Sequence, residues 1–183
     1  MDSKCKYVFM IAMLLNIVPS FVLAQTQQTA SPYLSYDWAF FELKGRVRAV
    51  TIVYKSQYSE TKETHYFNRN GELQGEEAYV DGEFENPYGY TRDDKGRIDG
   101  TGNGHHAWTW RGKTLVREDY GHMGSSATYI YTYNSDGKRT GYKNEKGKFI
   151  KYSYETHDGK GNWTSRSYRE EGYYTETRKI VYY

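Results

Sequence analysis

The chain has 183 residues, a length that suits one domain of ordinary size. Its 25 basic and 23 acidic residues leave a formal net charge of +2. This near balance gives no electrostatic reason to expect nucleic acid or an anionic membrane surface as a partner. Tyrosine is the unusual component, with 21 residues against seven Phe and four Trp. We therefore expect aromatic rings to cover sheet faces that aliphatic side chains cover in most proteins.

The first 24 residues have the pattern of a secretory signal peptide. Lys4 and Lys6 precede an apolar run over residues 7–18, and residues 22–24 are the short side chains that signal peptidase reads. The pattern predicts cleavage after Ala24. The apolar run is shorter than the roughly 20 residues that a membrane-spanning helix needs. An uncleaved anchor is the alternative, and no membrane span is expected after cleavage.

Cleavage would also remove Cys5, the only cysteine, so the mature chain would have neither disulfides nor thiol chemistry. We expect the protein in the periplasm of a Gram-negative bacterium or secreted from it. Residues 25–36 are polar and small up to Pro32 and predict a flexible leader.

One short helix is expected over residues 37–44. Asp37 is its expected N-cap, and Gly45 is its expected stop. Its aromatic side chains would close one end of the sheet; they are Trp38, Phe40 and Phe41.

The rest of the chain repeats a strand, a glycine-containing turn and a further strand. Residues 46–58 form the most apolar strand and carry apolar side chains on both faces, so we expect this strand where the sheet is most covered. Residues 99–104 and 121–126 are expected to be loops. The remaining strands are predicted at 62–67, 72–80, 88–91, 97–98, 105–110, 114–120, 129–133, 148–154, 163–168 and 173–183. One more strand is predicted after the 134–137 turn and ends at residue 142.

This order predicts an all-β protein built as a meandering antiparallel sheet of repeated hairpins. Because aliphatic residues are sparse, we expect the sheet to be largely single-layered and curved by its twist. A compact closed barrel is the alternative.

The segment 131–138, Tyr-Thr-Tyr-Asn-Ser-Asp-Gly-Lys, resembles the tyrosine-aspartate (YD, or Rhs-type) repeat of bacteria. Weaker copies lie at 66–71, 90–97 and 152–161. Residues 43–48, 161–164 and 178–183 resemble small exported members of that type from Gram-negative bacteria. The resemblance implies that residues 37–183 form one curved β-repeat domain without catalytic residues.

Trp108 and Trp110 are two positions apart in one predicted strand and share a face with His106. Exposed indole rings on a sheet would stack on sugar rings, and Trp163 is a further candidate for this role. The competing interpretation is core packing, which is favoured because a chain poor in leucine needs large aromatic side chains inside.

Catalytic and metal-binding patterns are weak. His105 and His106 are adjacent in a strand and point to opposite faces, and no spacing typical of a metal site occurs among the histidines. No cofactor is expected. A small periplasmic hydrolase that uses His106 or His122 with nearby acids is an alternative hypothesis.

These patterns favour a non-catalytic exported scaffold or binding protein of the bacterial envelope. Its Tyr- and Trp-rich sheet face would bind a glycan or an envelope protein. Another alternative is a shell fragment, or a partner, of a toxin that is encoded separately.

Overall fold

The computed structural model describes residues 33–183. The predicted signal peptide and most of the predicted leader lie outside this range. The described part contains one short helix and fourteen strands. Their bounds are α1 Tyr36–Phe40, β1 Val47–Lys55, β2 Glu60–Phe67, β3 Leu73–Val80, β4 Glu83–Glu85, β5 Tyr90–Arg92, β6 Ile98–Thr101, β7 His106–Arg111, β8 Thr114–His122, β9 Ser125–Tyr133, β10 Arg139–Lys143, β11 Phe149–Lys151, β12 Ser153–His157, β13 Trp163–Arg169 and β14 Tyr173–Tyr182.

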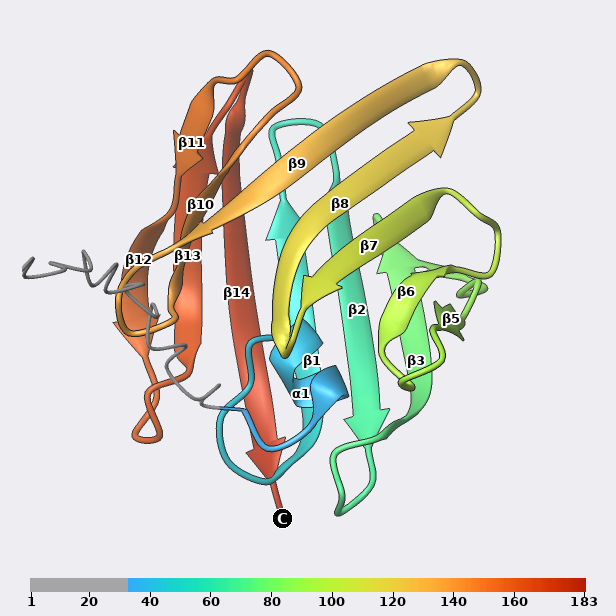
Figure 1. The fold of residues 1–183 in the computed structure, drawn as a ribbon, viewed down its shortest axis with the longest axis vertical. Coiled ribbons are helices and arrows are strands. Elements are labelled where there is room, and N and C mark those ends of the chain that lie inside the picture. The colour runs from blue at the N-terminus through green and yellow to red at the C-terminus, as the bar shows by residue number, and fades with distance from the viewer. Residues whose placement is uncertain (1–32) are drawn as a thin grey trace, which may run out of the picture.

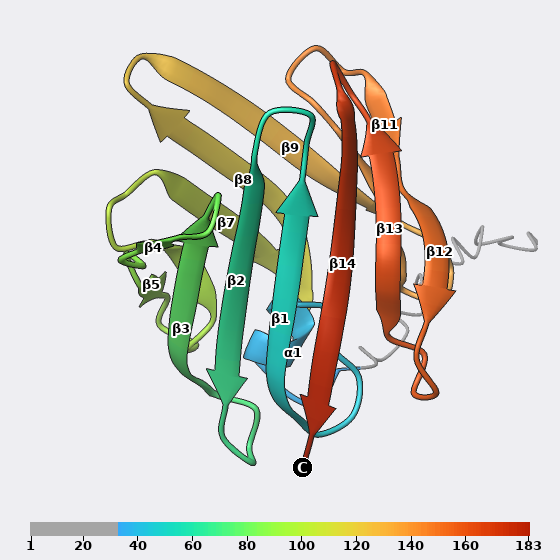
Figure 2. The same cartoon turned by 180° about the vertical axis from the view of Figure 1, so that it is seen from behind.

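The strands form two seven-stranded antiparallel sheets (Figures 1 and 2). The first has the order β12-β13-β14-β1-β2-β3-β4, and the second has the order β11-β10-β9-β8-β7-β6-β5. Within each sheet, strands adjacent in the chain are also adjacent in space, and β14 joins the two ends of the meander by pairing with β1. The prediction of an all-β antiparallel meander of repeated hairpins with one short N-terminal helix is confirmed. The sheets do not close into a barrel, which was the alternative.

The strands divide between two sheets instead of continuing as one layer because the chain leaves one sheet for the other at two places. Between β4 and β5, Pro87 lacks a backbone N–H, and Gly89 has a φ of +66°. The second crossing is a single residue, Tyr152. Its N–H still bonds to the carbonyl of Thr140 in the second sheet (2.9 Å), whereas Ser153 already pairs with the first sheet. The predicted strand 148–154 is therefore two strands, one in each sheet.

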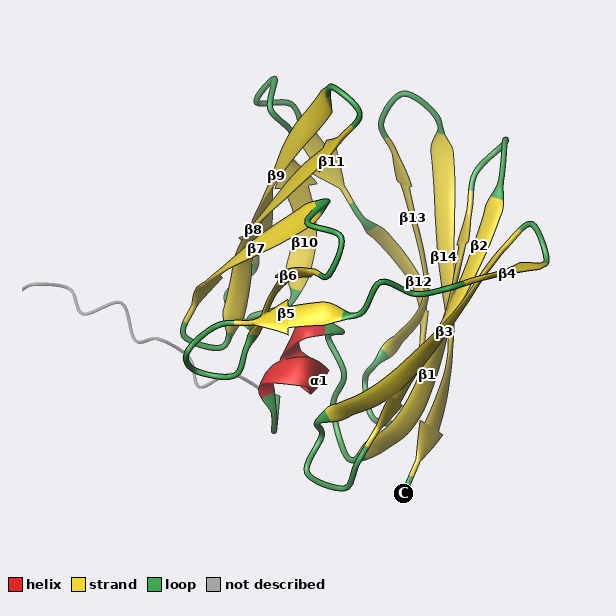
Figure 3. Ribbon diagram, turned by 90° about the vertical axis from the view of Figure 1, so that its right-hand side faces the viewer, coloured by secondary structure: helices red, strands yellow, loops and turns green. Residues whose placement is uncertain are grey.

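Helix α1 lies between the two sheets at one end (Figure 3). It begins one residue earlier than expected, because the Ser35 hydroxyl caps it by accepting the N–H of Trp38 (3.1 Å). The prediction of Asp37 as N-cap is wrong. Its buried carboxylate instead accepts two hydrogen bonds from Arg92 (both 2.8 Å) and one from the Leu73 N–H (2.7 Å).

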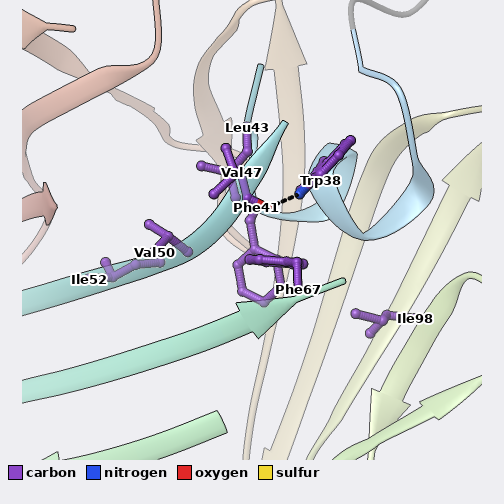
Figure 4. Close-up of a cluster of buried hydrophobic side chains, with 8 residues drawn as sticks. All are labelled: Trp38, Phe41, Leu43, Val47, Val50, Ile52, Phe67 and Ile98. Carbon is purple, nitrogen blue, oxygen red and sulfur yellow. Dashed lines mark hydrogen bonds between the residues drawn. The ribbon is translucent and has the colours of Figure 1, made fainter. Parts of the chain in front are cut away.

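The predicted end of the helix is also wrong. Helix α1 ends at Phe40, four residues before the expected end, and the chain then turns at Glu42, which has a φ of +54°. Two of the three aromatic residues of this segment enter the main hydrophobic core, and Phe40 packs against it. The indole N–H of Trp38 donates to the Val47 carbonyl (3.2 Å) and ties the helix to β1 (Figure 4). The buried core residues are Trp38, Phe41, Leu43, Val47, Val50, Ile52, Phe67 and Ile98.

Strand β1 occupies the centre of the first sheet, between β14 and β2. Its residues Val47, Val50 and Ile52 are buried. The expectation that this strand lies where the sheet is most covered is confirmed.

One turn structure recurs five times. Its first residue is Asn or Asp, whose side-chain oxygen accepts the N–H groups two and four residues later, and its fourth residue is a glycine with φ between +74° and +84°. Only glycine adopts this backbone conformation without steric cost. The repeated strand–turn–strand unit is thereby explained by one local hydrogen-bond pattern. The five turns span residues 68–71, 93–96, 134–137, 144–147 and 158–161.

Both predicted loops are shorter than expected. Gly100 lies in β6, where a Cβ atom would stand 2.7 Å from the Thr91 hydroxyl and 3.0 Å from the His106 carbonyl. This glycine serves close strand packing and not loop mobility. The second loop is reduced to a two-residue hairpin turn, in which Met123 and Gly124 both have positive φ.

We expect Gly71→Ala to lower the free energy of unfolding by about 2–4 kcal/mol. The positive φ costs about 1 kcal/mol, and the added methyl group would lie 2.4 Å from the Ser35 hydroxyl and 2.6 Å from the Trp38 ring. Gly82→Ala is the matched control, because Gly82 has a similar φ but open space around it. Urea denaturation of both variants would measure the difference. Equal losses would show that the packing of Gly71 against α1 contributes nothing.

Candidate functional site

A cavity of about 530 Å³ lies between the two sheets beside the end of α1. This volume is within the usual range for small-molecule sites. Strands of both sheets contribute to its walls, so the cavity exists only because the meander divides into two layers. The lining residues are Phe40, Phe41, Glu42, Ile52, Tyr54, Glu63, Tyr90, Thr101, His106, Trp108, Leu115, Glu118, Tyr129, Tyr131, Arg139, Tyr142, Tyr152, Arg166, Tyr168, Glu170, Tyr174, Glu176 and Arg178. We call this cavity the cleft.

Aromatic rings are the most frequent side chains in the cleft. Alternation along a strand places Tyr129 and Tyr131 of β9 on the same face, toward the first sheet. Tyr168 and Tyr174 are cross-strand partners on β13 and β14, and their rings stack with centroids 5.1 Å apart. Eight tyrosines in all line the cleft.

Three arginines and two glutamates of the cleft lining form a largely buried cluster. The guanidinium of Arg166 donates to Glu176 through Nε (3.0 Å) and Nη2 (2.7 Å), and to Glu42 through Nη1 (3.0 Å). Arg139 lies 3.7 Å from the same Glu42 oxygen, and Arg178 donates to the Phe41 carbonyl (2.7 Å). We call these five residues, Glu42, Arg139, Arg166, Glu176 and Arg178, the arginine cluster.

Aromatic rings cover the guanidinium planes of the cluster. Arg166 lies 4.1 Å from the centroids of both Tyr152 and Trp163, and Arg178 lies 3.4 Å from that of Trp163. Arg139 lies 4.1 Å from that of Tyr131. Such cation–π contacts compensate part of the hydration that buried arginines lose.

The arginines of the cluster hold the Glu42 carboxylate ionised. Burial opposes ionisation of Glu42, but the charges of Arg139, Arg166 and Arg178 outweigh it and lower the pKa of Glu42 to about 2. Burial and repulsion from Arg166 lower the pKa of Arg178 to about 10. The cleft therefore carries fixed positive and negative charges at neutral pH.

A second polar group lies on the wall formed by the second sheet. Nδ1 of His106 is 2.7 Å from Oε1 of Glu118, and the Tyr131 hydroxyl donates to the other oxygen of the same carboxylate. Burial opposes ionisation of Glu118, but the hydrogen bonds from His106 and Tyr131 lower its pKa overall. With Glu63 and Glu170, the cleft lining has five glutamates against three arginines, a net charge of −2 when the histidine is neutral.

The structure brings two of the four predicted binding residues to the cleft, namely His106 and Trp108. Their rings stack on one another with centroids 5.5 Å apart and an interplanar angle of 14°. Trp110 shares their face of β7, but its indole N–H donates to the Ile98 carbonyl (2.6 Å). Its ring packs against Tyr36 and Phe40. Trp110 therefore packs beside the core and does not line the cleft.

The fourth predicted binding residue, Trp163, and the hydrolase candidate His122 also lie outside the cleft. Trp163 is buried beneath Arg166 and Arg178 and lines a second, smaller pocket. His122 is not part of the cleft lining, and its Nδ1 is 3.0 Å from Nε2 of His105. A hydrolase site that uses His122 would have to be separate from the cleft.

The arginine cluster is the feature that sequence reasoning missed. Its members come from the turn after α1 and from β10, β13 and β14, so no local motif unites them. The one available signal is alternation: Glu176 and Arg178 are two positions apart on β14, and both point inward, whereas Lys179 lies on the other face. Charged residues at inward strand positions are uncommon and would have been the clue.

Comparison of the chain with protein-family models, with curated proteins and with solved structures finds no match. The resemblance to YD repeats stays a prediction. Within residues 33–183, no helix has the length and apolar character needed to cross a membrane. The same residues contain no group of three or more His, Cys, Asp or Glu side chains arranged to hold a metal ion.

Proposed function

We propose that the cleft binds a segment of a neutral carbohydrate chain, and that the protein acts as a non-catalytic binding or scaffold protein of the bacterial envelope. The observation that carries this proposal is the combined lining of tyrosine rings, Trp108 and ionised carboxylates in one cavity between the sheets. Aromatic rings offer flat apolar surfaces to the C–H faces of sugars, and carboxylates accept hydrogen bonds from their hydroxyl groups.

The charge of the cleft supports a neutral ligand. Its net charge of −2 disfavours acidic polysaccharides. Arg166 is already engaged by Glu42 and Glu176, Arg139 is paired with Glu42, and Arg178 donates to the Phe41 carbonyl. These internal hydrogen bonds hold the cleft walls in place before a ligand arrives, which reduces the entropy lost on binding.

A protein partner that adds a strand is less well supported. The outer strands of the two sheets are β4, β5, β11 and β12, which have three to five residues each. Short edge strands offer few free backbone groups for pairing.

We expect Trp108→Ala to weaken carbohydrate binding about tenfold, which corresponds to about 1.4 kcal/mol. The measurement is retention on immobilised hexasaccharides of glucose, xylose, mannose and N-acetylglucosamine, followed by calorimetry with the sugar that is retained. Tyr173→Ala is the control, because Tyr173 is an exposed aromatic residue outside the cleft lining. Unchanged affinity of the Trp108 variant, with unchanged stability in urea, would refute the assignment of the cleft.

A glycoside hydrolase is the second candidate, favoured by the contact of His106 with Glu118 inside the cleft. Incubation of the same hexasaccharides with the protein, followed by mass spectrometry, separates the two functions. Shortened products that disappear with Glu118→Gln would establish hydrolysis. Intact sugars in the presence of demonstrated binding would support the non-catalytic function.

A further inference from the structure

A second pocket, of about 170 Å³, lies near the arginine cluster and shares Glu42 with the cleft. It is lined by Tyr33, Glu42, Lys44, Asn134, Asp136, Gly137, Lys138, His157, Gly161 and Trp163. We call it the basic pocket, because Lys44, Lys138 and His157 meet there.

Two of the five recurring turns form the walls of the basic pocket. The 134–137 turn comes from the second sheet, and the 158–161 turn comes from the first. Asn162, which is 1% exposed, fixes Lys44 between them: its side-chain carbonyl accepts the Lys44 N–H (2.6 Å), and its amide donates to the Lys44 carbonyl (3.0 Å). The lysine is thus attached to a rigid part of the fold.

The positive groups of the pocket lie close to one another. Nζ of Lys138 is 3.0 Å from Nε2 of His157 and 3.8 Å from the centroid of the Tyr154 ring. Burial and the charge of Lys44 lower the pKa of Lys138, and burial together with the charges of Lys138 and Lys44 lowers the pKa of His157.

The acidic groups of the lining form no ion pair with these cations within residues 33–183, although the charge of Glu42 opposes the lowering of the Lys138 pKa. Glu42 is hydrogen-bonded to Arg166, and Asp136 is exposed in its turn, where its carboxylate accepts the Ser135 hydroxyl (3.4 Å). With His157 neutral, the two lysines of the lining equal Glu42 and Asp136 in number, but neither lysine is ion-paired with these carboxylates in the described part of the chain.

One lining residue of the pocket carries an unused hydrogen-bond donor. Trp163 is 4% exposed, and its buried indole N–H has no hydrogen-bond partner among the described residues. A buried donor without a partner costs about 1–3 kcal/mol, so an acceptor in the pocket would stabilise the protein.

We propose that the basic pocket binds a small oxyanion, such as sulfate, phosphate or a carboxylate, between Lys44, Lys138, His157 and the indole N–H of Trp163. A volume of about 170 Å³ accommodates one such ion with a few waters, since a water occupies about 30 Å³ in the liquid. This site shares only Glu42 with the cleft, and the proposal does not depend on carbohydrate binding there.

The test is an NMR titration of the ¹⁵N-labelled protein with sodium sulfate, sodium phosphate and sodium acetate at constant ionic strength. We expect a saturable shift of the Trp163 indole resonance, identified by its loss in Trp163→Phe, and a rise in the pKa of His157. Sulfate or phosphate binding alone would define a tetrahedral oxyanion site, and acetate binding alone would define a carboxylate site.

Lys138→Gln is expected to weaken anion binding at least tenfold. Lys95→Gln is the matched control, because Lys95 lies in the exposed 93–96 turn at the far edge of the second sheet. Equal affinities of the two variants, or shifts that do not saturate with any of the three anions, would overturn the proposal.

Discussion

Replacing Arg166 with Met is expected to lower the free energy of unfolding by about 3–5 kcal/mol. Methionine has a similar length and fills much of the same space, but it cannot donate hydrogen bonds. Glu42 and Glu176 therefore stay buried without their shortest hydrogen bonds. Removing one partner of a buried ion pair has this large effect because the remaining charge is neither hydrated nor paired. Urea denaturation at neutral pH measures the loss.

The control for this prediction is Arg117→Met. Arg117 also donates twice to a carboxylate, that of Asp119, but both side chains are substantially exposed. Exposed ion pairs contribute about 0–1 kcal/mol, so the control should be close to the wild type. Similar losses for Arg166 and Arg117 would show that the arginine cluster is not buried as described.

Acid is expected to remove about 3 kcal/mol of stability through Glu42 alone. Its pKa falls from an ordinary value of 4.5 to about 2 in the folded protein. A carboxyl group with a lowered folded pKa stabilises the fold above its unfolded pKa, and this contribution is lost as the pH falls from about 4.5 to about 2.

Comparison with Glu42→Gln isolates this contribution. At neutral pH the variant should be less stable than the wild type, because glutamine supplies no charge to Arg139 and Arg166. The difference should shrink as the pH is lowered through this range, as measured by thermal or urea unfolding at each pH. A difference that stays constant from pH 5 to pH 2 would contradict the depressed pKa of Glu42.

Local features were predictable from the sequence because they depend on neighbouring residues. The 134–137 turn needs only an Asn side chain, which bonds nearby N–H groups, and a glycine at positive φ. Alternation likewise placed His106, Trp108 and Trp110 on one face of β7. These rules suffice for an antiparallel meander with short turns.

Features that depend on distant parts of the chain were not predictable. Asp37 has the form of a helix cap, but Arg92 and Leu73 use its carboxylate, and Ser35 caps the helix instead. The change of sheet at Tyr152 could not be predicted, because the residues on both sides of Tyr152 lie in strands and the sequence has no turn between them.

The arginine cluster also depends on contacts between distant parts of the chain. Glu42 and Arg166 are 124 positions apart and meet only because β14 returns to pair with β1 and brings β13 beside it. Alternation along β14 shows only that Glu176 and Arg178 share a face, and not which distant carboxylate each arginine would meet. The candidate site was therefore predicted only on the side formed by β7.

Chemical-shift mapping of the labelled protein with the hexasaccharide that it retains tests the central claim most directly. If the cleft between the two sheets is the binding site, saturable shifts should appear at Trp108, Tyr131 and Tyr168, which line it from both sheets. Shifts confined to exposed aromatic residues such as Tyr58 and Phe84, or no saturable shift with any of the four sugars, would contradict it.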